Sequence, residues 1–397
     1  MPAARSLTAE FEVLTPLFLG GADQSRAELR PPSFRGLLRF WYRAADPAFR
    51  SWEPRLFGGI GEGEGQGAVL LRITSRRPPQ LVEWGSFRAD RFKQGQGRDT
   101  RNGLVYLGFP FQMKDGGRRA IATGHRFELR CLLRHAQGAS DNEHVQMQRR
   151  LAAAVWLLAH FGGAGSRSRR GFGSLALRNW SDAGGDWLEL DRLPLVSEAA
   201  SVQDARARLD RGLATIREWF GPWEQPDHAG QSPQHPHLGP SFRHALLDIS
   251  QTDWAQALAG IGGFMQKFRL RRAPDYQSVK DHLLAKTGQG GSLLSAAPER
   301  ATFGLPLTFR YSSIPRETAQ LLPQGGEGQM PLERHGSLLL LRLAAIGKQL
   351  HPHYVRMDGA VPGVTPRAIV RGTRRALLEP SRNAMDAFFD SLPSVRR

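Results

Sequence analysis

The chain has 397 residues, 40% of them hydrophobic, and carries 54 lysines and arginines against 37 acidic residues. Its formal net charge of +17 indicates attraction to nucleic acid or another acidic surface. The single cysteine, Cys131, excludes an intramolecular disulfide and a cysteine metal cluster, and fits a reducing cytoplasm. The first residues show no signal peptide, and no window has the length of a membrane span. We therefore expect a cytoplasmic protein without membrane contact, metal or cofactor.

The first predicted elements are a strand and an amphipathic helix. Residues 7–14 alternate polar and apolar side chains, which predicts a half-buried strand. A helix follows Pro31-Pro32, with Ser33 as its expected N-cap. Its predicted core stripe consists of Phe34, Leu37, Leu38 and Trp41. The opposite face carries Arg35, Arg39 and Arg43. None of these arginines has an acidic residue four positions further on, so we expect phosphate contact, although a solvated helix face is the alternative.

The next elements complete a recognisable order. Strands are predicted over residues 68–74, 104–111 and 125–133. Ser140 and Glu143 form a capping box for a helix that runs through His160 and ends at Gly162. A short strand, residues 175–177, follows. Strand–helix–strand–strand–helix–strand is the order of a ferredoxin-like or RRM-type module.

The second half repeats this theme more loosely. Helices are predicted near 202–220, 254–272 and 384–392, and strands near 245–249, 302–311 and 337–343. Residues 221–240 are rich in Pro, Gln, His and Gly, which predicts a disordered insertion. We therefore expect an α+β fold of two tandem ferredoxin-like domains, residues 1–183 and 184–397.

Two glycine-rich segments carry the main candidate ligand-binding residues. Their glycines are Gly20, Gly21, Gly162, Gly163, Gly165, Gly171 and Gly173. Glycine lets the backbone approach a ligand closely, and the planar guanidinium fork of arginine matches phosphate oxygens. We therefore expect RNA contacts from Arg26, Arg30, Arg35, Arg39, Arg43, Arg167, Arg169, Arg170, Phe172, Lys267 and Arg269.

The N-terminal pattern resembles a known family. Residues 15–23 (TPLFLGGAD) and 27–43 (AELRPPSFRGLLRFWYR) are similar to the N-terminus of the first RAMP subunits of Cmr complexes, the type III-B CRISPR effectors of antiviral defence. The segment 162–173 resembles the glycine-rich loop of RAMP proteins, and segments 303–307 and 334–338 resemble C-terminal patterns of the same subunits. The resemblance implies two ferredoxin-like RAMP domains and a non-catalytic subunit that contacts the 3′ region of the guide RNA (crRNA) and its target, beside other Cmr subunits.

Other chemistry has weaker support. Residues 170–177 resemble the RRM octapeptide but lack its stacking aromatics, so we expect RNA at the loops rather than on the sheet face. No glycine loop continues into the Lys-Ser or Lys-Thr of a phosphate-binding P-loop. The pairs His235/His237 and His351/His353 have metal-like spacing, but we interpret them as ordinary loop histidines.

Three hypotheses for function remain open. The first is a non-catalytic RNA-binding subunit, and the second is a metal-independent ribonuclease of the RAMP type. The third is a basic scaffold for acidic protein partners. Asp23, on the first glycine loop, is the carboxylate of most interest for a nuclease, although a turn cap or a pair with Arg26 explains it more simply. We favour the first hypothesis and expect no catalytic residue.

Overall fold

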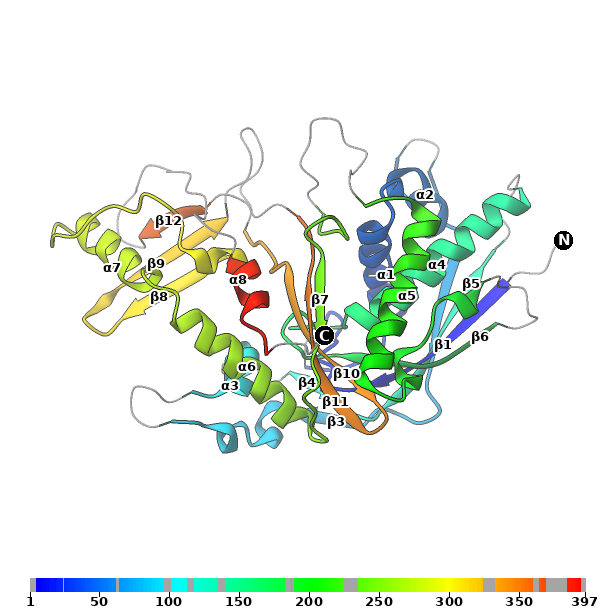
Figure 1. Ribbon diagram of the computed structural model, residues 1–397, viewed down its shortest axis with the longest axis horizontal. Coiled ribbons are helices and arrows are strands. Elements are labelled where there is room, and N and C mark those ends of the chain that lie inside the picture. The colour runs from blue at the N-terminus through cyan, green and yellow to red at the C-terminus, as the bar shows by residue number, and fades with distance from the viewer. Residues whose placement is uncertain are drawn as a thin grey trace. The chain divides into compact units, whose positions relative to one another are not determined.

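The computed structural model of the chain divides into two compact units (Figure 1). The first combines Met1–Gly263 with Leu340–Asp358, and the second combines Phe264–Leu339 with Gly359–Arg397. The structure describes residues 5–23, 25–61, 64–95, 101–112, 118–134, 140–182, 187, 189–223, 235–323, 333–359, 364–368 and 384–393. The expected division into RAMP domains 1–183 and 184–397 stays a prediction.

A four-stranded antiparallel sheet forms the centre of the first unit, in the order β2-β5-β1-β6. Its strands are β1 (Arg5–Val13), β2 (Val69–Thr74), β5 (Arg126–Leu133) and β6 (Leu175–Asp182). β1 pairs with both β5 and β6, and β2 pairs with β5. Along the chain the four strands come in the order β1, β2, β5, β6, so the sheet places the first strand between the third and the fourth. One helical segment connects β1 to β2, and another connects β5 to β6. This is the predicted ferredoxin-like arrangement.

Helices cover one face of this sheet (Figure 1). Helix α1 (Pro31–Ala45) contacts β2 and α4 (Asp141–Phe161) contacts β6, while α2 (Phe49–Phe57) and α5 (Val202–Phe220) pack on α1 and α4. On α1, the core stripe is as predicted at three positions, since Phe34, Leu38 and Trp41 are at most 1% exposed, whereas Leu37 is half-buried. Ser33 is not the N-cap: the helix already begins at Pro31, because the fixed φ of proline suits the first helical position.

The capping signals place the ends of α4 and α5. The Ser140 hydroxyl accepts the backbone N–H of Glu143 at 3.2 Å, and the Glu143 carboxylate accepts the Ser140 N–H at 3.0 Å. Gly162 is the C-cap of α4, as predicted. At the start of α5, the hydroxyl of Ser201 accepts the N–H of Asp204 at 3.1 Å.

The predicted strand 104–111 is wrong, because this segment forms helix α3 (Gly103–Gly108) and a following 3-10 turn. Asn102 caps α3 by accepting the N–H of Val105 at 3.0 Å, and Gly103 packs closely on the backbone of residue Ala259. The apolar run thus reflects burial on a helix rather than in a sheet. Nearby, the short strands β3 (Leu81–Glu83) and β4 (Arg119–Ile121) pair with each other.

Further strands and helices belong to both units. In the first unit, β11 (Gln349–Arg356) lies between β10 (Leu339–Ile346) and β7 (Arg243–Leu246). Helix α6 (Trp254–Leu270) starts in the first unit, and its residues from Phe264 onward belong to the second. The second unit contains the sheet β12-β9-β8, whose pairs are antiparallel. Its elements are α7 (Asp275–Lys286), β8 (Leu307–Tyr311), β9 (Ile314–Pro323), β12 (Val364–Ala368) and α8 (Ala384–Asp390). The α+β class is therefore as predicted.

The expected disordered insertion 221–240 divides into two parts. Residues 224–234 lie outside the described part of the chain. Residues 235–240, by contrast, have defined contacts: the backbone of His237 exchanges two hydrogen bonds of 2.9 and 2.8 Å with Asp358, and Leu238 is completely buried.

Candidate nucleic-acid interface

The two glycine-rich segments of the sequence lie against each other in the first unit. The backbone N–H of Ser166 donates to the carbonyl of Phe18 at 2.8 Å, and that of Gly173 donates to Pro16 at 3.1 Å. The Thr15 hydroxyl donates to the carbonyl of Gly171 at 2.7 Å. Residues 162–174, which we call the glycine loop, are therefore fixed on the segment that follows β1.

Contacts within the protein account for the glycines of this loop. Gly165, Gly171 and Gly173 have φ of +80°, +92° and +64°. Residues with a Cβ adopt such positive φ angles only at a cost in conformational energy. A Cβ at Gly165 would meet the Phe18 carbonyl, and one at Gly162 would meet the ring of Trp41. Gly163 is also buried, while Gly20 and Gly21 are half-buried in the segment after β1. The loop glycines thus serve close packing of the two segments.

Phe172 lies in the core rather than at a ligand surface. Its side chain is 0% exposed and packs among the rings of Phe18, Phe111 and Trp84, with centroids 5.3–5.9 Å away. A nucleotide base has no access to this ring, and we therefore leave Phe172 out of the proposed RNA surface.

Arg167 connects the glycine loop to helix α3 through hydrogen bonds to a backbone carbonyl. This residue has φ of +63°, and its guanidinium donates twice to the carbonyl of Leu107, at 2.8 and 2.6 Å. Burial lowers its pKa from the usual 12.5, although the group keeps its charge. Beside it, Arg170 forms a parallel bridge with Leu341 of β10.

Arg169 of the glycine loop is half-buried against α1, and burial lowers its pKa from the usual 12.5. Its guanidinium carbon is 5.5 Å from the ring centroid of Phe40, and the ring of His235 is 4.8 Å from that of Phe40. The charges of Arg169 and Arg43 both act on His235, whose pKa burial lowers to about 4, so the imidazole is neutral at pH 7. Loop and helix therefore share one basic region.

Two arginines of α1 share a carboxylate from α2. The Nε atoms of Arg39 and Arg43 donate to Glu53 at 2.5 and 2.6 Å. The Glu53 side chain is 7% exposed, whereas those of Arg39 and Arg43 are 34% and 36% exposed. Burial opposes ionisation of Glu53, but hydrogen bonds from both arginines hold its pKa below the usual 4.5. Helix α2, which the sequence analysis missed, thus supplies an acidic partner to this face.

We call the set Arg39, Phe40, Arg43, Arg169 and His235 the arginine surface. Arg39 and Arg43 share the single carboxylate of Glu53, and the guanidinium of Arg169 lies over the half-buried ring of Phe40. Phe40 and His235 were not expected from the sequence, because Phe40 stands between the predicted core and basic stripes and His235 joins from almost 200 positions away.

The other predicted basic residues have different surroundings. Arg35 donates to the carbonyls of Phe57 and Val69, both at 3.0 Å, and so ties α2 to β2. Arg30 pairs with Glu28 at 3.3 Å, and Arg26 is exposed. In the second unit, Lys267 is exposed, and the guanidinium carbon of Arg269 is 6.0 Å from the ring centroid of Phe303.

Candidate catalytic groups have structural partners. The Asp23 carboxylate accepts the backbone N–H and the hydroxyl of Ser25, at 2.9 and 2.6 Å, which is the predicted turn cap. These hydrogen bonds hold the pKa of Asp23 below its usual value. His351 and His353 lie on β11 rather than in a loop. Within the described residues, no group of three or more His, Cys, Asp or Glu side chains is arranged to hold a metal ion.

Comparison with known proteins first defines the class. Residues 10–176, which run from β1 to the start of β6, match the model of the RAMP superfamily.

The particular relatives are Cmr subunits. The chain is 22% identical to CRISPR system Cmr subunit Cmr1-2 of Pyrococcus furiosus over 191 residues, 43% of this chain and 93% of that protein. It is 23% identical to Cmr1-1 of the same organism over 207 residues, 49% of this chain and 52% of that protein. The resemblance to Cmr subunits found in the sequence is thereby confirmed.

Solved structures show the same fold. The apo crystal structure of Cmr1 from Pyrococcus furiosus has a TM-score of 0.59 at 18% identity and covers 97% of this chain and 96% of its own. A subunit of the type III-B Cmr-beta complex bound to cognate target RNA and AMPPnP, in the presence of ssDNA, has a TM-score of 0.53 at 12% identity, with coverage of 91% and 96%. Among the described helices, none has both the length and the apolar character needed to cross a membrane.

Proposed function

We propose that this chain is a non-catalytic RNA-binding subunit of a type III-B CRISPR effector, working in the cytoplasm beside other Cmr subunits. The arginine surface, together with exposed Arg26, would contact the sugar–phosphate backbone at the 3′ region of the guide RNA or of its duplex with target RNA. The observation that carries this proposal is that Arg39 and Arg43 of α1 share the single carboxylate of Glu53, while Arg169 of the glycine loop lies over Phe40 of the same helix. Its relatives' membership of Cmr complexes, one of them bound to target RNA, supports the choice of RNA.

The open face of the sheet favours binding at the loops. On this face, Arg126 donates to Glu12 at 2.9 Å and Arg178 donates to the same carboxylate at 3.1 Å. These ion pairs occupy positions where an RRM presents aromatic rings to bases. RNA backbone contact through arginine needs no such platform, and it fixes position without reading sequence. A subunit that accepts any guide needs this property.

In this proposal, RNA cleavage is carried out by other subunits of the complex. Asp23 accepts hydrogen bonds from Ser25 within its turn, and among the described residues no histidine bonds to it. The protein alone should leave labelled RNA intact, and Asp23→Asn should leave target cleavage by the assembled complex unchanged. Defined products from the protein alone, or loss of one cut in a complex that still assembles, would support the ribonuclease hypothesis instead.

The direct test of the proposal is RNA binding by the full chain at fixed salt. Because backbone contacts carry no sequence information, affinities for unrelated single-stranded RNAs of equal length should agree within about tenfold. A preference of about a thousandfold for one sequence would contradict a guide-handling role. Absence of binding to any RNA at low salt, together with binding to an acidic protein, would indicate the scaffold hypothesis.

A further inference from the structure

A buried arginine on β10 lacks the partners that its charge requires. Arg342 is 2% exposed, and its Nη2 donates to the carbonyl of Leu175 at 2.8 Å. Its Nε and Nη1 are buried without a hydrogen-bond partner in the described part of the chain. Burial lowers the pKa of Arg342 to about 9, which leaves it charged at neutral pH. Buried donors of a charged group that stay unpaired are costly, so a ligand is expected there.

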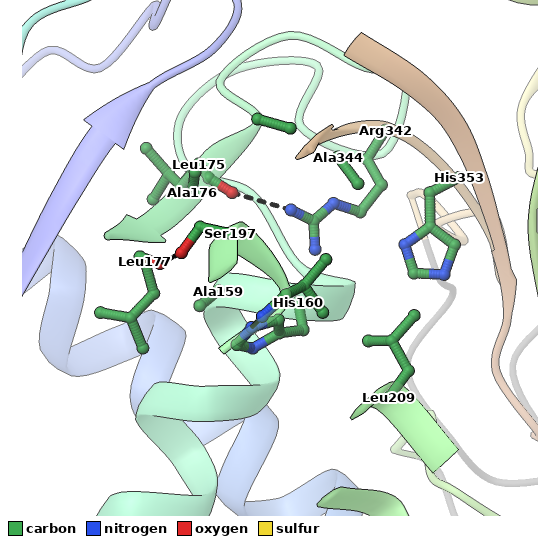
Figure 2. Close-up of a pocket in the computed structure, with 12 residues that line it drawn as sticks. Ala159, His160, Leu175, Ala176, Leu177, Ser197, Leu209, Arg342, Ala344 and His353 are labelled. Carbon is green, nitrogen blue, oxygen red and sulfur yellow. Dashed lines mark hydrogen bonds between the residues drawn. The ribbon is translucent and has the colours of Figure 1, made fainter. Parts of the chain in front are cut away.

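A small cavity lies beside this guanidinium. Its volume is about 20 Å³, and its lining consists of Arg342, His160, Ser197, His353 and small or branched apolar side chains. Figure 2 shows the unpaired terminal nitrogen of Arg342 pointing toward His160. No Asp or Glu belongs to the described lining of the cavity.

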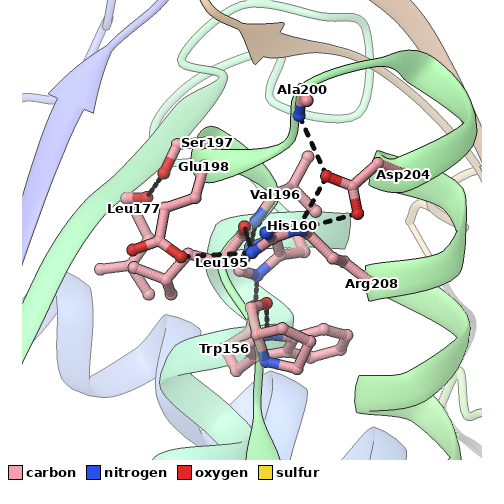
Figure 3. Close-up of polar contacts among 11 residues, drawn as sticks. Trp156, His160, Leu177, Leu195, Val196, Ser197, Glu198, Ala200, Asp204 and Arg208 are labelled. Atoms are coloured by element: carbon pink, nitrogen blue, oxygen red, sulfur yellow. Dashed lines mark hydrogen bonds and ion pairs between the residues drawn. The ribbon is translucent and has the colours of Figure 1, made fainter. Parts of the chain in front are cut away.

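Neither His160 nor Ser197 supplies negative charge. His160 Nδ1 is 2.7 Å from the carbonyl of Trp156, and its Nε2 accepts the N–H of Val196 at 3.2 Å (Figure 3). Burial lowers the pKa of His160 to about 3, so the imidazole is neutral. The Ser197 hydroxyl donates to the carbonyl of Leu177 at 2.5 Å. The counter-charge of Arg342 must therefore come from outside the lining.

A second buried arginine of the same unit shows the contrast. Arg150 has a side chain 7% exposed, and its Nε donates to the carboxylate of Asp46 at 2.9 Å. At Arg342 the described lining offers no carboxylate, and a cavity lies beside the side chain instead. A single water molecule needs a cavity of about 10–15 Å³, so this cavity holds one particle of about that size.

We propose that this cavity binds one monovalent, halide-sized anion through Nε and Nη1 of Arg342. The site is too small for a nucleotide phosphate, and it is separate from the arginine surface. Arg342 also bonds the first residue of β6, and the neighbouring N–H of Leu343 donates to the hydroxyl of Ser174 at 3.1 Å. The bound anion would thus stabilise the junction between β10 and the end of the glycine loop.

The test compares thermal unfolding of the full chain, without RNA, in potassium bromide and potassium gluconate at equal ionic strength. Bromide fits the cavity and gluconate does not, so we expect bromide to raise Tm saturably by about 2–4 °C. Arg342→Met should abolish this rise. Arg206→Met is the matched control, because Arg206 also donates to a backbone carbonyl, that of Leu246, but is only half-buried. This variant should keep the rise.

Two further measurements make the outcome decisive. If Arg342→Met does not fold, Ala344→Val narrows the cavity without removing the cation and should reduce the bromide effect. Bromide-soaked crystals should show one anomalous peak within hydrogen-bond distance of Arg342. The proposal is overturned by an equal Tm in both salts, by an unchanged bromide effect in Arg342→Met or Ala344→Val, or by a cavity that holds only water.

Discussion

At the scale of single residues, the arginines of this protein differ in what they contact, and their positions in the sequence conceal the difference. Arg35 and Arg167 donate to backbone carbonyls, while Arg39 and Arg43 share Glu53. A search for acidic residues four positions after each arginine does not find Glu53, because Glu53 belongs to the neighbouring helix α2. The burial of Phe172 is equally difficult to predict from the sequence. An aromatic residue in a glycine loop can either stack on a nucleotide base or pack in the core.

The Glu53 pairs lead to a prediction about stability and its pH dependence. Glu53→Gln removes two charge-assisted hydrogen-bond pairs from a buried position, so it should lower the free energy of unfolding at pH 7 by about 1–3 kcal/mol. Because the folded-state pKa of Glu53 lies below 4.5, its contribution is fully present above that pH and is lost as pH falls through the folded pKa. Denaturant unfolding between pH 3 and 7 should show the two proteins converging in acid.

The same variant should affect RNA binding in the opposite direction. Loss of the carboxylate leaves Arg39 and Arg43 free to pair with phosphate, so Glu53→Gln should bind RNA more tightly than the wild type. Glu12→Gln, which removes a paired carboxylate from the sheet's open face, changes net charge equally and should have a smaller effect. A stability difference independent of pH, or equal affinity gains in both variants, would contradict this account of Glu53.

At the scale of secondary-structure elements, local signals predicted some boundaries and failed at others. Capping at Ser140 placed the start of α4, because the cap hydrogen bonds are made within four residues. The segment 104–111 was assigned wrongly, since a short apolar run is compatible with a buried strand or a buried helix. Asn102, which caps α3, was the signal that could have decided it. Helix α2 carries Pro54 inside it, which obscured its periodicity.

The packing of α1 can be tested on its apolar stripe. Trp41 is 1% exposed and borders Gly162, so Trp41→Ala should lower the free energy of unfolding by about 3–5 kcal/mol, as for other large buried aromatics. Leu37 lies on the same stripe but is half-buried, and Leu37→Ala should cost less, below about 2 kcal/mol. Chemical denaturation measures both. A silent Trp41→Ala with a severe Leu37→Ala would mean that the helix faces the core with a different side.

At the scale of the whole molecule, element order predicted the ferredoxin-like sheet, because strand–helix–strand–strand–helix–strand restricts the topology to few arrangements. The compact units were beyond such reasoning. Each combines two separate stretches of chain, and β10 and β11 return to the first unit from beyond residue 339. Formation of the arginine surface depends on such long-range contacts, since His235 reaches Phe40 across the intervening chain. The net charge indicated a polyanion, but not which arginines face it.

The measurement that tests the central claim most directly is the salt dependence of RNA affinity in two matched variants. One combines Arg43→Gln with Arg169→Gln on the arginine surface. The other combines Arg126→Gln with Arg178→Gln on the sheet's open face and changes net charge equally. Each phosphate contact on single-stranded RNA contributes about 0.7 to the slope of log affinity against log salt, so the first variant should lose about 1.4. The second should keep the wild-type slope. An unchanged slope in the first variant, or an equal loss in both, would contradict RNA binding at the arginine surface.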